Sequence, residues 1–248
     1  MRIIGIIPAR YASTRFPGKP LADILGKSMI QRVYEQALSC SSISEVWVAT
    51  DDERIAVHVN EFGGKSIMTL PSHDSGTERC HEAFEKIDAS AEAVINIQGD
   101  EPFVSPDQLD QLAQLIAKDE VEIATLVKRI EDPEVLLDPN KVKVVMGSQM
   151  QALYFSRSPI PYMRESKIQD WVNSHDYYKH LGLYAYRTEV LREIVHLEEG
   201  VLEQSEKLEQ LRWLERGKSI YCGITKYESP AVDTPDDLAK IIASGVYS

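Results

Sequence analysis

The N-terminal segment is apolar at consecutive positions. Isoleucine occupies four of the five positions in residues 3–7. Side chains alternate between the two faces of a strand, so this strand has apolar side chains on both faces. Such strands occur in parallel sheets that helices cover on both sides. We therefore expect residues 3–7 to form a central strand of an α/β protein and to end at Pro8.

The same order of strand, polar turn and helix recurs through the first half of the chain. Further strands are predicted at residues 46–49, 65–68 and 93–97. Helices are predicted at residues 29–38, 55–62, 77–87 and 109–116. Strands that alternate with helices in this way indicate a doubly wound, mostly parallel central sheet with helices on both faces.

The second half of the chain has a different pattern. β-rich segments are predicted at residues 142–146, 152–156 and 181–186, with residues 157–180 as a Pro- and Arg-containing stretch between the last two. We interpret this part as an elaboration that shapes an acceptor pocket and a dimer contact. A helix containing Leu208, Leu211 and Leu214, a strand near Ile220 and a last helix opened by residues 234–237 are expected to complete the chain.

Composition limits the partners of the protein. The formal net charge is −12, which argues against binding to nucleic acid or to an anionic membrane surface. No apolar stretch of about 18 residues and no signal-peptide pattern is found, so we expect a cytoplasmic protein. The three cysteines are far apart, and we expect buried, reduced thiols.

Cations are concentrated in one loop of this acidic chain. Residues 8–20 contain Arg10, Arg15 and Lys19, together with two aliphatic hydroxyl side chains and Gly18. Guanidinium and ammonium groups beside a glycine that exposes backbone amides suit a triphosphate. The loop lacks the spacing of a Walker A motif, and the chain has no G-x-G-x-x-G motif, so a P-loop or a dinucleotide site is not indicated.

Two aspartates stand at the ends of predicted elements. Asp100 follows the predicted strand 93–97 and stands beside a glycine, where it either holds a cation near phosphate oxygens or forms an ordinary turn. Asp233 precedes the last predicted helix, a position at which an aspartate commonly caps the helix.

Eight motifs are found in order along nearly the whole chain. They are RYASTRFPGKPL at 10–21, ATDD at 49–52, SGTER at 75–79, NIQGDEP at 96–102, ALYFSR at 152–157, YKHLGLYAY at 178–186, KLEQLR at 207–212 and VDTPDD at 232–237. This series resembles the 3-deoxy-manno-octulosonate cytidylyltransferases, or CMP-Kdo synthetases. The first loop alone would indicate only the broader superfamily of sugar nucleotidyltransferases.

The resemblance implies an activity and a fold. It implies the transfer of CMP from CTP to the acidic eight-carbon sugar Kdo, with release of pyrophosphate, for lipopolysaccharide biosynthesis. It also implies a Rossmann-like nucleotidyltransferase fold, Mg²⁺ as cofactor and a homodimer. We accordingly expect a single domain over residues 1–248, with 1–130 mainly nucleotide-binding and 131–230 mainly for sugar binding and dimerisation.

The resemblance also implies roles for individual residues. The triphosphate would be held by Arg10, Ser13, Arg15 and Lys19. Cytosine and ribose would be read by Ser75, Gly76 and Arg79. Mg²⁺ would be held by Asp100 and Asp233, which with Arg10, Arg15 and Lys19 form the expected catalytic set. The sugar pocket would be lined by Gln98, Arg157, Arg164, His180, Tyr184, Glu209 and Gln210.

The chemistry of the residues is compatible with these roles. Arg157 and Arg164 can pair with a sugar carboxylate through their guanidinium forks, although either alone is more often a surface residue. His180 is a structural histidine or a sugar contact. No G-x-S-x-G elbow or Cys/His pair indicates a covalent nucleophile. Direct in-line attack by the sugar hydroxyl on the α-phosphorus is therefore expected.

Two other functions remain open at this level. One is cytidylyl transfer to a related acid, such as 8-amino-Kdo or a sialic-type acid, because few pocket contacts separate these acceptors. The other is a non-catalytic nucleotide-binding regulator with the same fold.

Overall fold

The computed structural model describes residues 1–13, 15–87 and 90–244. The chain divides into two compact units. Unit 1 consists of residues 1–114 together with the C-terminal segment 228–248, and unit 2 consists of residues 115–227. The return of the C-terminal segment to the first unit brings together residues that lie more than a hundred positions apart in the sequence. The expected single domain over residues 1–248, with residues 1–130 mainly for nucleotide binding, stays a prediction.

Unit 1 contains a parallel sheet with β1 in a central position. The strands are β1 (Ile3–Ala9), β4 (Glu45–Thr50), β5 (Ser66–Met68) and β6 (Ala93–Asn96). β1 pairs in parallel with β4 on one side and with β6 on the other, and β5 extends the sheet beyond β4. A short hairpin is formed by β2 (Asp23–Ile24) and β3 (Lys27–Ser28).

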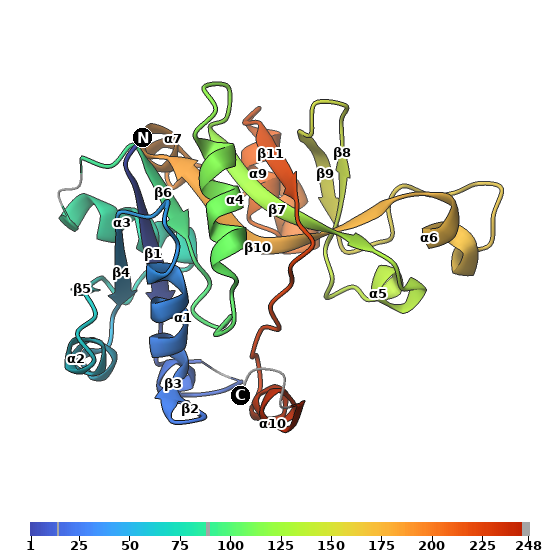
Figure 1. The fold of residues 1–248 in the computed structure, drawn as a ribbon. Helices are drawn as coiled ribbons and strands as arrows, with labels where there is room; N and C mark the ends of the chain where they lie inside the picture. The colour runs from blue at the N-terminus through green and yellow to red at the C-terminus, as the bar shows by residue number, and fades with distance from the viewer. Residues whose placement is uncertain (14, 88–89, 245–248) are drawn as a thin grey trace. The chain divides into compact units, whose positions relative to one another are not determined.

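Two helices of unit 1 begin at side-chain caps that the sequence supplies. The helices of this unit are η1 (Lys19–Leu21), α1 (Met29–Leu38), α2 (Glu53–Glu61), α3 (Gly76–Ile87), α4 (Pro106–Ile116) and α10 (Pro235–Ser244). Ser28 and Asp52 accept backbone N–H bonds at the starts of α1 and α2. Both α1 and α3 contact β1 (Figure 1), and its isoleucines are buried. These contacts explain why β1 has no polar face.

The end of β1 differs from the sequence-based prediction. Pro8 does not end the strand, because pairing with β4 continues through Pro8 and Ala9. The Ile6 carbonyl accepts a bond from Ile97 on the β6 side. Alternate residues of a strand direct their backbone groups to the same side, so the Pro8 nitrogen also faces the β6 side. The β1–β6 ladder has already ended at Ile6 there, so the missing N–H costs no ladder bond.

The C-terminal segment is fastened to unit 1 just before α10. The Val232 backbone N–H donates to the Asp100 carbonyl at 2.9 Å. The Val232 side chain is fully buried in a cluster with Ile24, Met29 and Ile241. This anchor places the next residue, Asp233, beside the loop that follows β6.

Unit 2 is mostly antiparallel. Its strands are β7 (Ile123–Ile130), β8 (Lys143–Met146), β9 (Ala152–Ser156), β10 (Tyr177–Arg187) and β11 (Ile220–Ile224). β10 pairs antiparallel with β7 and β8, β9 pairs antiparallel with β8, and β11 runs parallel to β7. The helices are α5 (Pro133–Leu137), η2 (Ile168–Asp170), α6 (Trp171–Ser174), α7 (Thr188–Ile194), α8 (Val201–Glu206) and α9 (Gln210–Glu215).

The α/β prediction and the β-rich second half are confirmed, with two corrections of extent. The strand predicted at 181–186 is the second part of β10, which begins at Tyr177 and has an irregular register with β7 between Leu181 and Tyr184. Leu208 precedes α9 and is not part of it. β7 was not predicted.

Two further expectations concern single features of the chain. All three cysteines are free and buried, as expected. Within the described residues, no helix combines the length and apolarity that a membrane crossing requires.

Candidate active site

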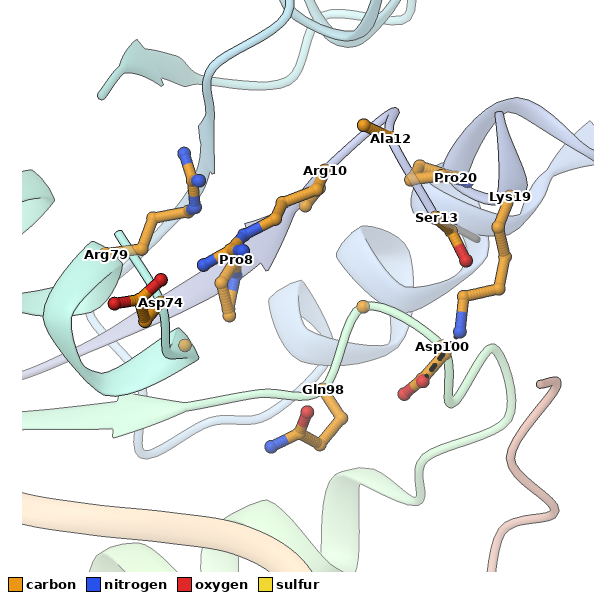
Figure 2. Close-up of a pocket in the computed structure, with 13 residues that line it drawn as sticks. Pro8, Arg10, Ala12, Ser13, Lys19, Pro20, Asp74, Arg79, Gln98 and Asp100 are labelled. Atoms are coloured by element: carbon orange, nitrogen blue, oxygen red, sulfur yellow. Dashed lines mark hydrogen bonds and ion pairs between the residues drawn. The ribbon is translucent and has the colours of Figure 1, made fainter. Parts of the chain in front are cut away.

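A pocket of about 300 Å³ opens in unit 1 at the carboxyl ends of β1 and β6. Ligands of open α/β sheets bind at this edge. The cation-rich loop, the start of α3 and the loop after β6 all contribute to its wall (Figure 2). The lining residues are Pro8, Ala9, Arg10, Ala12, Ser13, Lys19, Pro20, Asp74, Gly76, Arg79, Gln98, Gly99 and Asp100.

The cation-rich loop is folded around the Tyr11 carbonyl. That oxygen accepts backbone bonds from Ser13 and Gly18, each at 2.9 Å. Gly18 has a φ of 72°, and a Cβ there would lie 3.1 Å from the Tyr11 ring. Only glycine adopts this conformation in this space without strain. The loop therefore returns to the pocket, and η1 presents Lys19 on the same wall as Ser13.

Lys19 joins the two predicted magnesium ligands. Its Nζ lies 2.8 Å from Asp100 Oδ2 and 3.7 Å from Asp233 Oδ1. Arg15 forms a two-pronged ion pair with Asp233, at 3.0 and 3.1 Å. The Lys19 side chain is only 15% exposed, so this ammonium group is held between the carboxylates and not on the open surface. The structure thus brings Asp100, Asp233, Arg15 and Lys19 together.

The hydrogen bonds at the start of α10 show whether Asp233 caps that helix. The Thr234 hydroxyl accepts the Asp237 N–H at 3.2 Å, and Asp237 accepts the Thr234 N–H at 2.9 Å. This reciprocal pair satisfies the first donors of the helix, as in a capping box. Asp233 is therefore not the cap, and its carboxylate points to Arg15 and Lys19 instead.

The carboxylate oxygens of Asp100 and Asp233 are ligands that fit a magnesium ion. Mg²⁺ binds through one or two carboxylates and fills its other positions with water and phosphate oxygens. Asp100 and Asp233 supply two carboxylates within reach of one ammonium group. Among the described residues, no group of three or more His, Cys, Asp or Glu side chains forms a metal cage. A site of this kind suits an ion that arrives with a phosphate ligand.

The residues that were predicted to bind cytosine and ribose lie at the start of α3. Gly76 and Arg79 line the pocket. Arg79 is fully buried, bonds Thr69 and pairs with Asp51 at 3.3 Å, but its Nε has no hydrogen-bond partner among the described residues. Burial lowers the pKa of Arg79. The negative charge of Asp51 raises this pKa, and the positive charge of Arg10 lowers it further. The Ser75 hydroxyl accepts the Glu78 N–H at 3.2 Å, so the structure gives it a capping role in α3.

The predicted sugar residues other than Gln98 lie in unit 2. His180 and Tyr184 are four residues apart, a spacing of about 13 Å in a regular strand, but their ring centroids are 5.1 Å apart. The irregularity of β10 brings them together, and bulges of this kind occur next to active sites.

The ring of His180 is neutral and has a defined tautomer. Burial lowers the pKa of His180 to about 3. The Thr125 hydroxyl donates to the Leu183 carbonyl at 2.7 Å, so at the 3.0 Å contact with His180 it accepts from Nε2. Nδ1 is therefore left as a hydrogen-bond acceptor. Burial, Tyr186 and Glu209 all raise the pKa of Tyr184, so its phenol is neutral.

Arg157 has a different environment from the one expected. Its guanidinium donates to the carbonyls of Glu206, Pro139 and Lys207, at 2.7, 3.0 and 3.3 Å. It therefore stabilises the end of α8, where backbone carbonyls lack partners. Arg164 lies exposed in the loop before η2. Gln210 is buried at the start of α9, and Glu209 precedes it. The sugar-binding roles of these residues stay predictions.

Comparison with known proteins identifies the family. The family model described as cytidylyltransferase matches residues 4–220. The 3-deoxy-manno-octulosonate cytidylyltransferase of Cytophaga hutchinsonii is 52% identical over 240 residues, which cover 96% of each chain. That of Bacteroides thetaiotaomicron is 53% identical over 241 residues, with the same coverage. The chain belongs to the 3-deoxy-manno-octulosonate cytidylyltransferase family.

Solved structures agree with this membership. A CMP:2-keto-3-deoxy-manno-octonic acid synthetase complexed with CTP has a TM-score of 0.92 and 44% identity, and the match covers 100% of this chain and 99% of that one. A 4-diphosphocytidyl-2C-methyl-D-erythritol synthase from Anaerococcus prevotii has a TM-score of 0.63 at 14% identity, covering 98% of both chains. The latter shows only the shared fold, which confirms the predicted nucleotidyltransferase architecture.

Some pocket residues of this 3-deoxy-manno-octulosonate cytidylyltransferase family member were not predicted. Asp74 and Gly99 line the pocket. Asp74 directly precedes the SGTER motif, so its position next to a predicted helix start could have indicated it. The role of Gly99 depends on contact with another strand, because a Cβ there would lie 2.8 Å from the Pro8 carbonyl oxygen. No local sequence signal reports that contact.

Gly99→Ala is expected to displace Asp100. The added methyl would collide with backbone, which cannot move aside as a side chain can, so we expect a loss of about 1–3 kcal/mol in the free energy of unfolding and a fall in kcat. Chemical denaturation and steady-state kinetics measure the two effects. Gly147→Ala is the control, since its nearest neighbour lies 3.6 Å away. Equal behaviour of the two variants would contradict the close approach.

Proposed function

We propose that this protein transfers CMP from CTP to 3-deoxy-D-manno-octulosonate, releasing pyrophosphate and forming CMP-Kdo for lipopolysaccharide biosynthesis. The observation that carries the proposal is the meeting of Lys19, which lines the pocket of unit 1, with Asp100 and Asp233. This cluster has the charges that a metal–triphosphate complex needs. Relatives that are about half identical over nearly the whole chain support the choice of CTP and Kdo.

The residues of the pocket have distinct tasks in this reaction. Arg10, Ser13 and Lys19 bind the triphosphate and orient its α-phosphorus. The anomeric hydroxyl of the sugar forms a bond from oxygen to that phosphorus, the bond to the β-phosphate oxygen breaks, and the hydroxyl proton leaves to solvent. Lys19 and Arg15 stabilise the charge on the departing pyrophosphate.

Mg²⁺ dependence is part of the proposal. Asp100 and Asp233 would hold the ion. When bound, Mg²⁺ neutralises phosphate charge and lowers the pKa of the sugar hydroxyl. The ion pairs of Asp100 with Lys19 and of Asp233 with Arg15 and Lys19 limit the mutual repulsion of the two carboxylates.

Pyrophosphate release tests the proposed reaction. The purified protein is incubated with CTP, Mg²⁺ and either Kdo, 8-amino-Kdo or a sialic-type acid. We expect pyrophosphate release with Kdo. EDTA should abolish this release and Mg²⁺ should restore it. Faster release with another acid would assign a different acceptor, and CTP binding without turnover would favour a nucleotide-binding regulator.

Homodimer formation and a cytoplasmic location are further parts of the proposal. Family membership supports both, since the resemblance implies a dimer and CTP is a cytoplasmic metabolite. Light scattering coupled to size exclusion is expected to give twice the chain mass of 28.0 kDa. A monomer mass would refute the dimer, and recovery of activity outside the soluble cell fraction would refute the location.

A further inference from the structure

The segment between β5 and α3 is held against one face of α3. Glu78, Glu82 and Lys86 are spaced four residues apart, so they share that face. We call residues 70–75 the His73 loop. It ends at the pocket, because the next residue, Gly76, is a lining residue.

Glu82 fastens the beginning and the middle of the His73 loop. Its Oε2 accepts the Leu70 N–H at 2.8 Å and also the Nε2–H of His73. Its Oε1 pairs with Lys86 at 2.7 Å, and Lys86 in turn donates to the Met68 carbonyl at 2.9 Å. The side chains of His73 and Glu82 are 16% and 15% exposed, so this contact is largely shielded from water.

Glu78 fastens the end of the same loop. Its Oε2 accepts the Asp74 N–H at 2.9 Å and lies 3.6 Å from His73 Nδ1. The imidazole ring of His73 is therefore held between two carboxylates of α3. The His73 carbonyl and the Asp74 N–H belong to one peptide group, so the bond to Glu78 and the ring contact with Glu82 together fix the direction of that carbonyl.

The backbone of His73 contacts the triphosphate-binding wall. Its carbonyl oxygen accepts a bond from the guanidinium of Arg10. Arg10 extends from the end of β1 toward Asp74 in Figure 2, and both residues line the pocket. A long arginine side chain has many conformations, and an acceptor at its tip selects one of them.

We propose that His73 is a positioning residue: by holding its loop on Glu82 and Glu78, it directs the Arg10 guanidinium into the pocket for CTP. This inference rests on the proposed function. His73 does not touch the nucleotide in this account. Its effect passes through Arg10, so it should be absent when Arg10 is absent.

Calorimetric titration of CTP without sugar tests the proposal. His73→Ala is expected to weaken CTP binding about tenfold, whereas His73→Gln, whose amide can donate to Glu82, should retain most of the affinity. His81→Ala is the matched control on α3, where the ring lies 4.0 Å from Glu85. If His73→Ala unfolds, Glu82→Gln should show the same loss of affinity in a folded protein.

A double-mutant cycle separates positioning from general destabilisation. If His73 acts through Arg10, the variant with both Arg10→Ala and His73→Ala should bind CTP as Arg10→Ala does. Additive losses, or unchanged affinity in His73→Ala, would overturn the inference alone. A wild-type protein that does not bind CTP would refute the proposed function together with it.

The pH dependence of stability tests the contacts of Glu82. Burial opposes ionisation, but bonds from Lys86, Leu70 and His73 lower the pKa of Glu82 to about 2, well below the ordinary value of 4.5. A carboxylate whose pKa is lower in the folded state than in the unfolded state stabilises the fold at pH values above the unfolded-state pKa. This stabilisation is lost as the pH falls toward the folded-state pKa. The stability advantage of wild type over Glu82→Gln should therefore shrink between about pH 5 and pH 3. A constant difference would contradict the contacts.

Discussion

Asp100→Asn and Asp233→Asn should each lower kcat by about 10²- to 10³-fold. Each change removes one negative charge from the pair of carboxylates that would hold Mg²⁺. The fold should be retained, since asparagine has the same shape and both aspartates are partly exposed, at 28% and 44%. Pyrophosphate release over a Mg²⁺ titration, together with thermal unfolding, measures the two quantities.

Asp236→Asn is the control for these variants. Asp236 lies exposed in the first turn of α10, three positions beyond Asp233, and should have a rate close to wild type. Wild-type rates for Asp100→Asn or Asp233→Asn at saturating Mg²⁺ would refute the metal assignment. A large loss in Asp236→Asn would instead indicate that any charge change near α10 disturbs the site.

Lys19→Met should lower kcat/KM for CTP by about 10²-fold. Lys19 is the one residue whose ammonium group lies within 4 Å of both Asp100 and Asp233 among the contacts of the described residues. Its loss leaves two carboxylates facing the triphosphate without that cation, so KM for CTP should rise and pyrophosphate departure should slow. Methionine keeps the length of the side chain, which limits the change in packing.

Lys27→Met is the matched control for Lys19→Met. Lys27 also forms a lysine–carboxylate pair, with Glu35, but both partners are more than 40% exposed and lie outside the pocket. Exposed pairs of this kind contribute little to stability, so near wild-type kinetics are expected. Unchanged kinetics in Lys19→Met would show that the triphosphate binds elsewhere.

The parallel half of the fold could be predicted because its strands β1 and β6 are buried on both faces. The isoleucines of β1 and the run at 93–97 have no polar alternation, and each is followed by a helix with a recognisable start. β7 escaped prediction because a short apolar run does not separate a buried strand from a buried helical segment. The length of β10 was also underestimated, since its irregularity breaks the period-two pattern.

The sequence left the surroundings of two candidate residues open. Asp233 could have capped α10, but Thr234 and Asp237 satisfy the helix start and leave its carboxylate to pair with Arg15 and Lys19. Arg157 donates to three backbone carbonyls, partners that the sequence did not indicate, and its sugar-binding role stays a prediction. Only the tertiary structure shows which polar groups surround each of these side chains.

The amino-acid sequence by itself determined the α/β class, the cation-rich loop after β1 and the family. These properties depend on residue types at short spacing or on matched motifs, which need no knowledge of distant contacts. Tertiary structure alone decided that Lys19 and Asp100, 81 positions apart, and Arg15 and Asp233, 218 positions apart, share one site. The physical reason is that Val232 is buried beside β2 and α1 and bonds the Asp100 carbonyl, and this packing fixes the place of Asp233.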